Sequence, residues 1–379
     1  MSAHKPVPKV FFASIDAHEK KENNLLNKLE RLYEALEFEK LLNPNELAAI
    51  KTHFGEEGTT RYLRPIYLER LVECLRKDGV KPFITDTNTY YVDHRQNAVE
   101  HLYTAQRHGF YPPTISAPIV IADGLLGSDL VEVSVEGDHF KTVNIGSTLH
   151  KAHAILVATH FKGHVVTGFG GAIKNLGMGG ASRAAKLKIH GAVALVSDRC
   201  VGCQACVDSC HMNAISKDET GDKAVVNPEV CDSCGECSIE CYNDAIDPDW
   251  DRGSVYNKEE VQQRIVEYAL GVSTPKQGKV CYFNFLLDIT PECDCEPWAD
   301  HPIVKDIGVL ASMDIVAIDQ ASVDLVNAQE GIRETLLESG HERGGDKFKA
   351  LNGVNWEAQL DHGEKMGLGS RKYELVEVK

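Results

Sequence analysis

Eight cysteines carry the strongest chemical signal in this sequence, because they share one spacing, C-x2-C-x2-C-x3-C, that occurs twice. The first group is Cys200, Cys203, Cys206 and Cys210, and the second, 31 positions later, is Cys231, Cys234, Cys237 and Cys241. Thiolates bind iron strongly, and a short loop with two-residue gaps directs three sulfurs to three corners of one 4Fe–4S cubane. Since the loop cannot close around the cube, the fourth corner must come from elsewhere in the chain.

Residues 197–250 resemble the bacterial-type two-cluster ferredoxin module, in which the fourth cysteine of each group serves the other cluster. The resemblance implies one cluster on Cys200, Cys203, Cys206 and Cys241 and a second on Cys231, Cys234, Cys237 and Cys210. An Ala-Ile pair follows each group at the same offset, as expected of an internal repeat. The proline that usually follows the fourth cysteine is replaced by His211 and Tyr242, which bears on the turn and not on ligation.

Other uses of these cysteines fit the sequence less well. Zinc sites usually use two separated pairs of cysteines, and disulfides need an oxidising compartment. The N-terminal residues show no signal-peptide pattern, and no run of 18 apolar residues predicts a membrane span. The sequence therefore predicts a cytoplasmic protein that uses its cysteines for metal. A net charge of −16 over 379 residues argues against nucleic-acid binding, which needs a basic surface.

The rest of the chain alternates between short apolar strands and amphipathic helices, which predicts an α/β domain with a parallel or mixed sheet. The expected strands are 9–15, 50–54, 80–85, 119–122, 154–159 and 280–287, and the expected helices are 23–40, 62–77, 97–108, 319–329 and one that begins at 257. A β-hairpin is expected over 130–145. The polar, glycine-rich stretch from 340 is expected to be mobile and to precede a closing strand at 373–378.

The cysteine groups interrupt this alternation, so they are expected to form a separate unit. We predict that residues 1–197 and 251–379 form the two parts of one α/β domain. A small α+β two-cluster ferredoxin-like domain is predicted to be inserted at residues 198–250.

A second signal is a stretch without acidic residues. None of the 56 acidic residues of the chain lies between Asp138 and Asp198. Polar runs also follow three expected strands, at 86–88, 123–124 and 160–164, and ligands of open α/β sheets bind beyond such carboxyl ends. Because cations that face a cleft attract anions, we expect an anionic substrate or cofactor there. The residues expected to bind it are Asp86, Asn88, His160, Lys162, His164 and Lys174. The alternative is a buried segment beside a solvated basic face.

The segment from Gly168 to Gly180 is dense in glycine but matches neither the Rossmann nor the Walker pattern. We expect a generic anion-binding loop there, or a tight loop packed under the sheet. His160 and His164 could bind a metal if they lay on a helix, but Gly163 and the preceding strand favour a loop, where hydrogen bonding is the commoner role.

Cys293 and Cys295 form a further group outside the two cysteine motifs. They would serve as a soft-metal site, as redox-active or cofactor-contacting thiols, or as buried structural thiols. The neighbouring acids Glu292, Asp294 and Glu296 are expected to raise the thiol pKa values, which disfavours a reactive thiolate in the absence of a metal.

Several of these segments together resemble an uncharacterised family of iron–sulfur centre proteins, the domain of unknown function 362. The resemblance covers roughly residues 45–330 and rests on residues 54–58, 85–89, 121–125, 160–164, 170–177 and 293–295. It implies an α/β domain with a ferredoxin-like module, mostly in anaerobic cells, and no settled reaction. A looser resemblance, to the nickel-pincer lactate racemase, implies a cofactor tethered to Lys174. The Pro-Gly that follows this lysine in that enzyme is replaced here by Leu176-Gly177.

Three functions follow from these observations. The first is a cytosolic iron–sulfur electron-transfer protein or oxidoreductase that passes single electrons between two 4Fe–4S clusters and either a ligand in the α/β cleft or a redox partner protein. The second is a racemase-like or lyase-like enzyme with a cofactor on or near Lys174 and structural clusters. The third is a docking module for an acidic partner. The first function is favoured, because a module that served only a structural purpose would not need two adjacent clusters capable of electron transfer.

Overall fold

A mixed eight-stranded sheet forms the larger part of the protein, whose computed structural model describes residues 6–249, 254 and 256–379. In sheet order the strands are β16 (Glu374–Glu377), β1 (Lys9–Ser14), β15 (Gly308–Ser312), β14 (Val280–Leu286), β7 (Ala154–His160), β2 (Leu47–Lys51), β3 (Lys81–Asp86) and β4 (Ile119–Ile121). The two pairings of β15 are antiparallel and the other five are parallel. The predicted α/β architecture is therefore confirmed.

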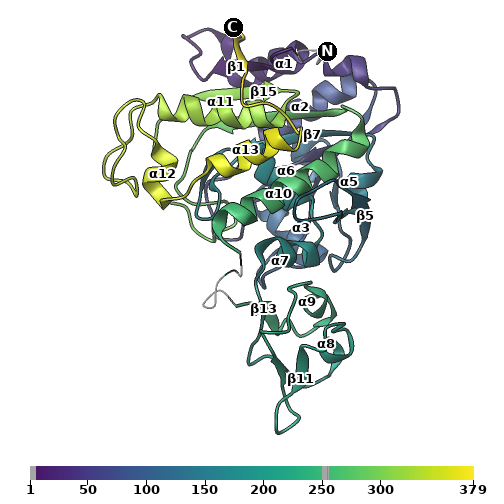
Figure 1. Ribbon diagram of the computed structural model, residues 1–379. Helices are drawn as coiled ribbons and strands as arrows, with labels where there is room; N and C mark the ends of the chain where they lie inside the picture. Colours follow the sequence, from purple (N-terminus) through teal and green to yellow (C-terminus); the bar gives the residue numbers. More distant parts are fainter. Residues whose placement is uncertain (1–5, 250–253, 255) are drawn as a thin grey trace, which may run out of the picture.

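Helices cover both faces of this sheet, so its central strands are buried on both sides. Every residue of β7 and β14 is buried, which explains their unbroken apolar sequences. One face packs against α1 (Leu25–Ala35), α2 (Pro65–Lys77), α3 (Ala98–Arg107) and α4 (Pro112–Ile115). The other packs against α6 (Ala172–Gly180) and α11 (Ile315–Asn327), which are covered in turn by α10 (Lys258–Ser273) and α13 (Glu357–Lys365), as Figure 1 shows.

Side-chain caps fix where several of these helices begin. Asn24 accepts the backbone N–H of Asn27 at the start of α1, and Asn97 accepts two backbone N–H groups at the start of α3. Asp314 does the same for α11. Each cap satisfies N–H groups that a first helical turn leaves unpaired. The helix expected over 319–329 therefore begins earlier, at Ile315.

Short elements connect the layers and border the site. The expected hairpin is present as β5 (Leu130–Ser134) and β6 (Thr142–Gly146), and a second hairpin pairs β8 (Lys162–His164) with β9 (Gly168–Gly170). The remaining helices of the α/β part are α5 (Ser147–Lys151), α7 (Arg183–His190) and α12 (Lys347–Asn352), with 3-10 turns at Lys21–Asn23, Phe38–Leu41 and Thr274–Lys276.

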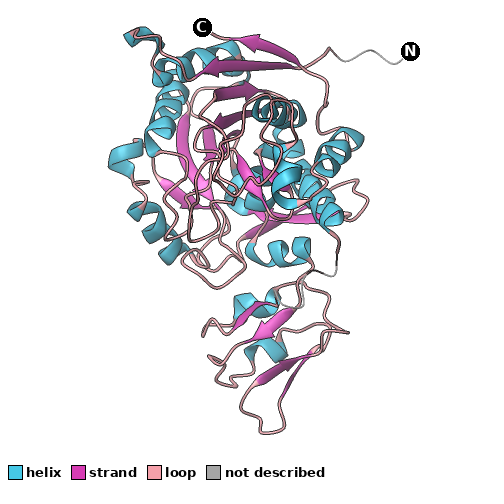
Figure 2. Ribbon diagram, turned by 90° about the vertical axis from the view of Figure 1, so that its left-hand side faces the viewer, coloured by secondary structure: helices cyan, strands magenta, loops and turns pink. Residues whose placement is uncertain are grey.

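The cysteine-rich segment forms a smaller unit beside α7, at the bottom of Figures 1 and 2. It contains β10 (Ala194–Val196), α8 (Ala205–Asp208), β11 (Ile215–Lys217), β12 (Ala224–Val226), α9 (Glu236–Glu240) and β13 (Ile246–Pro248). Pairings of β10 with β13 and of β11 with β12 give two small antiparallel sheets, separate from the main sheet. This arrangement is the inserted ferredoxin-like module that the sequence predicts. Its expected end at residue 250 lies outside the described residues.

Two expectations from the sequence are wrong. The glycine-dense segment is not a loop but strand β9 followed by helix α6. Its glycines allow close packing, since a Cβ on Gly177 would lie 2.1 Å from the backbone oxygen of Ile265 in α10. The polar segment from 340 contains helices α12 and α13, whose buried Phe348 and Leu360 join the apolar core. The closing strand is present as β16.

Candidate functional site

A cleft of about 490 Å³ lies at the carboxyl ends of the parallel strands. Lys51 and Asp86 reach it from the ends of β2 and β3, and Lys162, Lys174 and Lys186 reach it from β8, α6 and α7. The cleft therefore occupies the place where ligands bind in sheets of this kind, and several of its walls carry lysines.

The ends of β2 and β3 are joined by a buried ion pair. The ammonium of Lys51 lies 2.9 Å from the carboxylate of Asp86 and donates a 2.7 Å hydrogen bond to Oδ1 of Asn175 in α6. Burial opposes the charge of Asp86, but Lys51 outweighs it and holds the pKa of Asp86 below its usual value. Burial also lowers the pKa of Lys51. Lys51 thus neutralises Asp86 and locks helix α6 against the strand ends.

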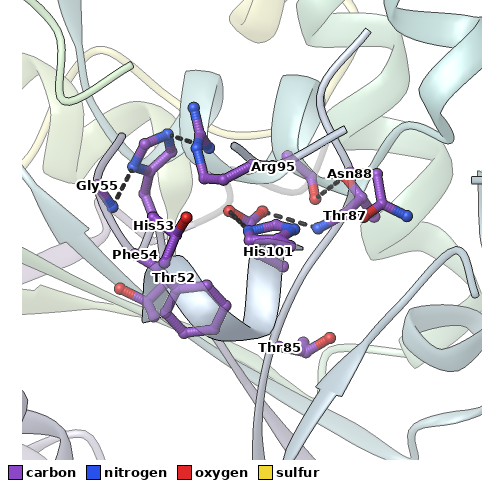
Figure 3. Close-up of polar contacts among 12 residues, drawn as sticks. Thr52, His53, Phe54, Gly55, Thr85, Thr87, Asn88, Arg95 and His101 are labelled. Carbon is purple, nitrogen blue, oxygen red and sulfur yellow. Dashed lines mark hydrogen bonds and ion pairs between the residues drawn. The ribbon is translucent and has the colours of Figure 1, made fainter. Parts of the chain in front are cut away.

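A second buried network surrounds Arg95, which Figure 3 shows beside the strand ends. Nε of Arg95 lies 2.8 Å from a carboxylate oxygen of Glu56, and Nη1 lies 2.9 Å from Nε2 of His53. Arg95 also donates to the hydroxyl of Tyr91 at 2.6 Å. Burial and the guanidinium together lower the pKa of His53 well below its usual value, so that this imidazole is neutral at pH 7.

Lys162 is paired with a buried carboxylate that does not itself line the cleft. Its ammonium lies 3.3 Å from Asp294 and donates to the backbone oxygen of His160 at 2.8 Å. The imidazole of His160 uses Nδ1 for Asp294, at 2.8 Å, and Nε2 for the backbone oxygen of Leu287, at 2.9 Å. Because both ring nitrogens of His160 are engaged behind the cleft wall, the structure does not place it among the cleft residues. The expected role of His160 in ligand binding stays a prediction, which this placement does not favour.

Lys174 forms an ion pair with a sulfur. Its ammonium lies 3.1 Å from Sγ of Cys293. A hydrogen bond from the Cys295 thiol and the charges of Lys174 and Lys162 lower the pKa of Cys293 well below its usual value, although burial acts in the opposite direction. Burial disfavours the charged form of Lys174, but the sulfurs outweigh it and raise the pKa of Lys174. Both shifts favour a Cys293 thiolate beside a Lys174 ammonium, whereas the acidic neighbours of Cys293 led to the expectation of a raised thiol pKa.

Lys186 differs from the other cations of the cleft. It donates to Oγ1 of Thr87 at 2.6 Å and to the backbone oxygens of Thr87 and Asn88. Among the described residues that line the cleft, it is the cation with no carboxylate or thiolate within ion-pair distance. Burial lowers the pKa of Lys186 to about 8. The carboxylates of Asp123 and Asp86 act on its charge from beyond ion-pair distance.

Asn88 has a structural role. Its backbone N–H and its side-chain amide both donate to Oδ1 of Asp123 at 3.0 Å, and the amide also donates to the backbone oxygen of Gly124. These bonds join the ends of β3 and β4. Asn88 is therefore not among the residues that line the cleft, whereas Asp86, Lys162, His164 and Lys174 are.

The amino end of helix α6 does not offer the expected anion-binding loop. The backbone N–H groups of Ala172 and Ile173 donate to the carboxylate of Asp319 in α11, at 2.7 and 2.9 Å. Asn284 of β14 donates to the same carboxylate at 2.8 Å. An internal carboxylate therefore occupies the position that an external anion would take at this helix end.

The eight motif cysteines line two separate cavities. Cys200, Cys203, Cys206 and Cys241 line the first, and Cys210, Cys231, Cys234 and Cys237 line the second. Three backbone N–H groups point at the sulfurs, from Ala224 to Cys200, from Ala214 to Cys210 and from Ala245 to Cys241, at 3.2–3.4 Å. Four thiols around an apolar cavity, with N–H groups directed at the sulfurs, are a donor set that fits a 4Fe–4S cubane.

Both cysteine-lined cavities share a wall with the cleft. In strand β13, Ile246 lines the first cavity and the next residue, Asp247, lines the cleft. Successive side chains of a strand point to opposite faces, so one strand separates the two spaces. In helix α7, Leu187 lines the second cavity while Lys186 and His190 line the cleft.

Sequence reasoning missed Lys51, His53, Tyr91 and Arg95 among the cleft residues. Lys51 could have been found as a lone charged residue at the end of an apolar strand, because a charge is costly to bury without a partner. Arg95 lies in a loop and gave no comparable signal. Lys186 lies within the acid-free stretch but is not among the ligands expected from the sequence.

The chain matches the family model described as "Domain of unknown function (DUF362)" over residues 48–324. Since the match covers most of the chain, the protein belongs to this family. The sequence resemblance is therefore confirmed.

Two curated proteins are similar over short segments that each cover 14% of the chain. Ferredoxin-1 of Caulobacter vibrioides is 40% identical over 57 residues, and the indolepyruvate oxidoreductase subunit IorA of Thermococcus kodakarensis is 39% identical over 54 residues. The chain spans about half (49%) of the length of the first and 8% of the second. These similarities support an iron–sulfur module of ferredoxin type.

A solved structure, that of the lactate racemase apoprotein from Thermoanaerobacterium thermosaccharolyticum, is similar over 74% of this chain and 51% of its own. The sequence identity is 11% and the TM-score 0.37, values too low to bear on function. Over the described part of the chain, no helix is both long and apolar enough to cross a membrane.

Proposed function

We propose that this protein is an iron–sulfur oxidoreductase in which two 4Fe–4S clusters exchange single electrons with an anion bound in the α/β cleft. Cys200, Cys203, Cys206 and Cys241 would hold one cluster, and Cys210, Cys231, Cys234 and Cys237 the other. Each cluster supplies one-electron transfer. Residues 198–250 would form the inserted domain, and residues 1–197 and 251–379 the two parts of the α/β domain. A separate redox protein would deliver or accept the electrons.

The observation that carries this proposal is the pair of shared walls. One strand separates the first cysteine-lined cavity from the cleft, and one helix separates the second from it. A purely structural metal module would not need to border a cleft lined with lysines. Because close approach favours electron transfer, the arrangement fits delivery of electrons to a ligand in the cleft.

Charge balance supports an anionic ligand. Lys51, Arg95, Lys162 and Lys174 are neutralised by Asp86, Glu56, Asp294 and Cys293, respectively. Within the described part of the cleft, Lys186 has no carboxylate at ion-pair distance, and Asp123 and Asp86 act on its charge only from farther away. An anion that reached Lys186 would make a charge-assisted contact in a partly desolvated site, where such a contact is strong.

The environment of Lys174 argues against a cofactor tethered to its amine. An amine must lose its proton to act as a nucleophile, but the sulfur of Cys293 raises the pKa of Lys174. We therefore expect the peptide that contains Lys174 to have its unmodified mass. A mass increment on that peptide, in protein purified from its native source, would instead support the racemase-like function.

Docking of an acidic partner on the acid-free stretch between Asp138 and Asp198 also fits the structure less well. Lys162 and Lys186 are buried inside the cleft, where a protein surface would not reach them. Lys141, Lys151 and Lys188 are exposed, but they lie on separate elements.

The proposal is tested by anaerobic purification with quantitation of iron and acid-labile sulfide. We expect about eight of each per chain, because each 4Fe–4S cluster contributes four. Protein that binds zinc, or that lacks iron after anaerobic reconstitution, would overturn the proposal.

A further inference from the structure

Cys293 and Cys295 lie together on the wall of the cleft, apart from the eight motif cysteines. A turn, closed by a hydrogen bond from the N–H of Glu296 to the backbone oxygen of Cys293 at 3.0 Å, places the two cysteines on one side. The two sulfurs and a ring nitrogen of His164 lie within 4.8 Å of one another. Residues two apart in a turn fall within the Cα separation of about 4.4–6.8 Å that a disulfide requires.

The surroundings of this pair hold one sulfur as a thiolate in a fixed position. Lys174 contacts Sγ of Cys293 at 3.1 Å. Asp294, between the two cysteines, is anchored by His160 at 2.8 Å and Lys162 at 3.3 Å. Cys293 is buried, while Cys295 lines the cleft itself. The pair thus combines a buried, ion-paired sulfur with a second sulfur that faces the cleft.

A metal fits this position poorly. Nδ1 of His164 accepts the backbone N–H groups of Val166 and Thr167 at 3.2 and 3.1 Å. Burial lowers the pKa of His164 well below its usual value, so the ring is neutral and its single proton lies on Nε2. A ring nitrogen that carries a proton has no lone pair for a metal. The ammonium of Lys174, in contact with Cys293, would also repel a cation there.

The dithiol is connected to the ferredoxin-like module through adjacent residues. The hydroxyl of Tyr91 donates to the backbone oxygen of Cys295 at 3.3 Å. The next residue, Val92, donates its backbone N–H to the carboxylate of Asp247 at 3.1 Å. Asp247 lies in β13, whose Ile246 lines the first cysteine cavity. A short series of contacts therefore leads from one cluster position to the thiol pair.

From this placement we propose that Cys293 and Cys295 form a redox-active dithiol that exchanges two electrons with the cluster module. The inference rests on the proposed function, since the clusters supply the electrons. In the reductive direction the Cys293–Cys295 disulfide bond breaks and takes up two electrons and one proton. Cys295 leaves as the thiol and Cys293 as the thiolate paired with Lys174. The two electrons arrive one at a time through the clusters, from an external one-electron carrier protein of low potential.

A disulfide between residues two apart closes a very small ring. Strained disulfides have more oxidising potentials and are the labile, catalytic ones. Such a pair would convert two one-electron transfers into one two-electron step beside the anion-binding Lys186. This conversion gives the two-cluster module a defined task within the cleft.

The test is an anaerobic count of reducing equivalents on the full protein, first oxidised with diamide and then titrated with photoreduced deazaflavin. Wild type should take up about four electrons per chain, one for each cluster and two for the disulfide. Cys293→Ser and Cys295→Ser should each take up about two. Cys74→Ala, which removes a buried cysteine of α2, is the matched control and should take up about four.

Alkylation of the same samples, followed by mass spectrometry of the peptide that contains residues 293–295, shows whether Cys293 and Cys295 are the group that takes up the two additional electrons. We expect no label after oxidation and two labels after reduction through the clusters. Reduction by a phosphine, which bypasses the clusters, should also give two labels. Iron content, cluster absorption and circular dichroism of the serine variants should match wild type, which shows that they fold.

The outcomes separate this inference from the proposed function. A wild-type count of about two electrons, with both clusters reduced in the EPR spectrum, would overturn the dithiol and leave the clusters in place. A disulfide that is reduced by the phosphine but not through the reduced clusters would also overturn the proposed electron exchange with the clusters. One equivalent of zinc, lost in both serine variants, would show a metal site instead. Absence of reducible clusters would overturn the proposed function itself.

Discussion

Replacement of Lys186 by methionine tests the proposed anion-binding cleft, because no carboxylate of the described site lies within ion-pair distance of this lysine. Methionine keeps much of the length of the side chain and removes its charge. The contacts to Thr87 and Asn88 show where the ammonium is held, beside the cleft and on the helix that borders the second cysteine cavity.

The size of the effect follows from the burial of this charge. A hydrogen bond to a charged group contributes about 1.5–3 kcal/mol. Loss of one such contact should raise the dissociation constant for a bound anion by about 10- to 150-fold. Lys188→Met removes the same charge from an exposed position of the same helix. It should change the dissociation constant by no more than about twofold, because exposed charges are screened by solvent and salt.

Isothermal titration with sulfate is a suitable assay, since sulfate keeps its charge across the pH range of interest. Burial lowers the pKa of Lys186 to about 8, and only the protonated form attracts an anion. The affinity of wild type should therefore fall about tenfold from about pH 7 to about pH 9, while that of Lys186→Met should change little. Equal affinities for wild type and Lys186→Met, or an equal loss in Lys188→Met, would refute the role of this lysine.

Three further predictions concern the clusters, the thiolate and the packing of α6. Cys237→Ala, which removes one of the four thiols that line the second cavity, should lower the iron content from about eight to about four atoms per chain in an iron assay. Lys174→Met should slow alkylation of Cys293 by iodoacetamide at least about tenfold at neutral pH, as followed by mass spectrometry, because its ammonium lowers the thiol pKa; an unchanged rate would contradict the ion pair. Asp319→Ala should lower the urea-unfolding free energy by about 2–4 kcal/mol, because it leaves the N–H groups of Ala172 and Ile173 without acceptors. A loss below about 0.5 kcal/mol would refute that assignment.

Periodicity was sufficient to predict the sheet and most of its helices. Runs such as 154–159 and 280–287 are apolar because their strands are covered on both faces, and this cause is visible in the sequence. The glycine-dense segment was misassigned, because glycine serves both loops and close helix packing. Only the position of Ile265, far away in the sequence, shows which role applies.

The cleft was predictable in location but only partly in composition. Asp86, Lys162 and Lys174, which strand ends and the acid-free stretch indicated, do line the cleft, and their role in binding stays a prediction. Whether a polar residue faces the cleft depends on its partners, and these come from distant segments. His160 is held by Asp294 from behind the wall, and sequence spacing gives no sign of that contact.

Low-temperature EPR of the fully reduced protein, with spin quantitation, tests the central claim most directly. Two clusters in one small module should give about two spins per chain, with the broadened signals of neighbouring paramagnets, and Cys237→Ala should give one isolated signal. A colourless anaerobic preparation without any EPR signal, or one spin in wild type, would contradict an electron-transfer module with two clusters at the wall of the cleft.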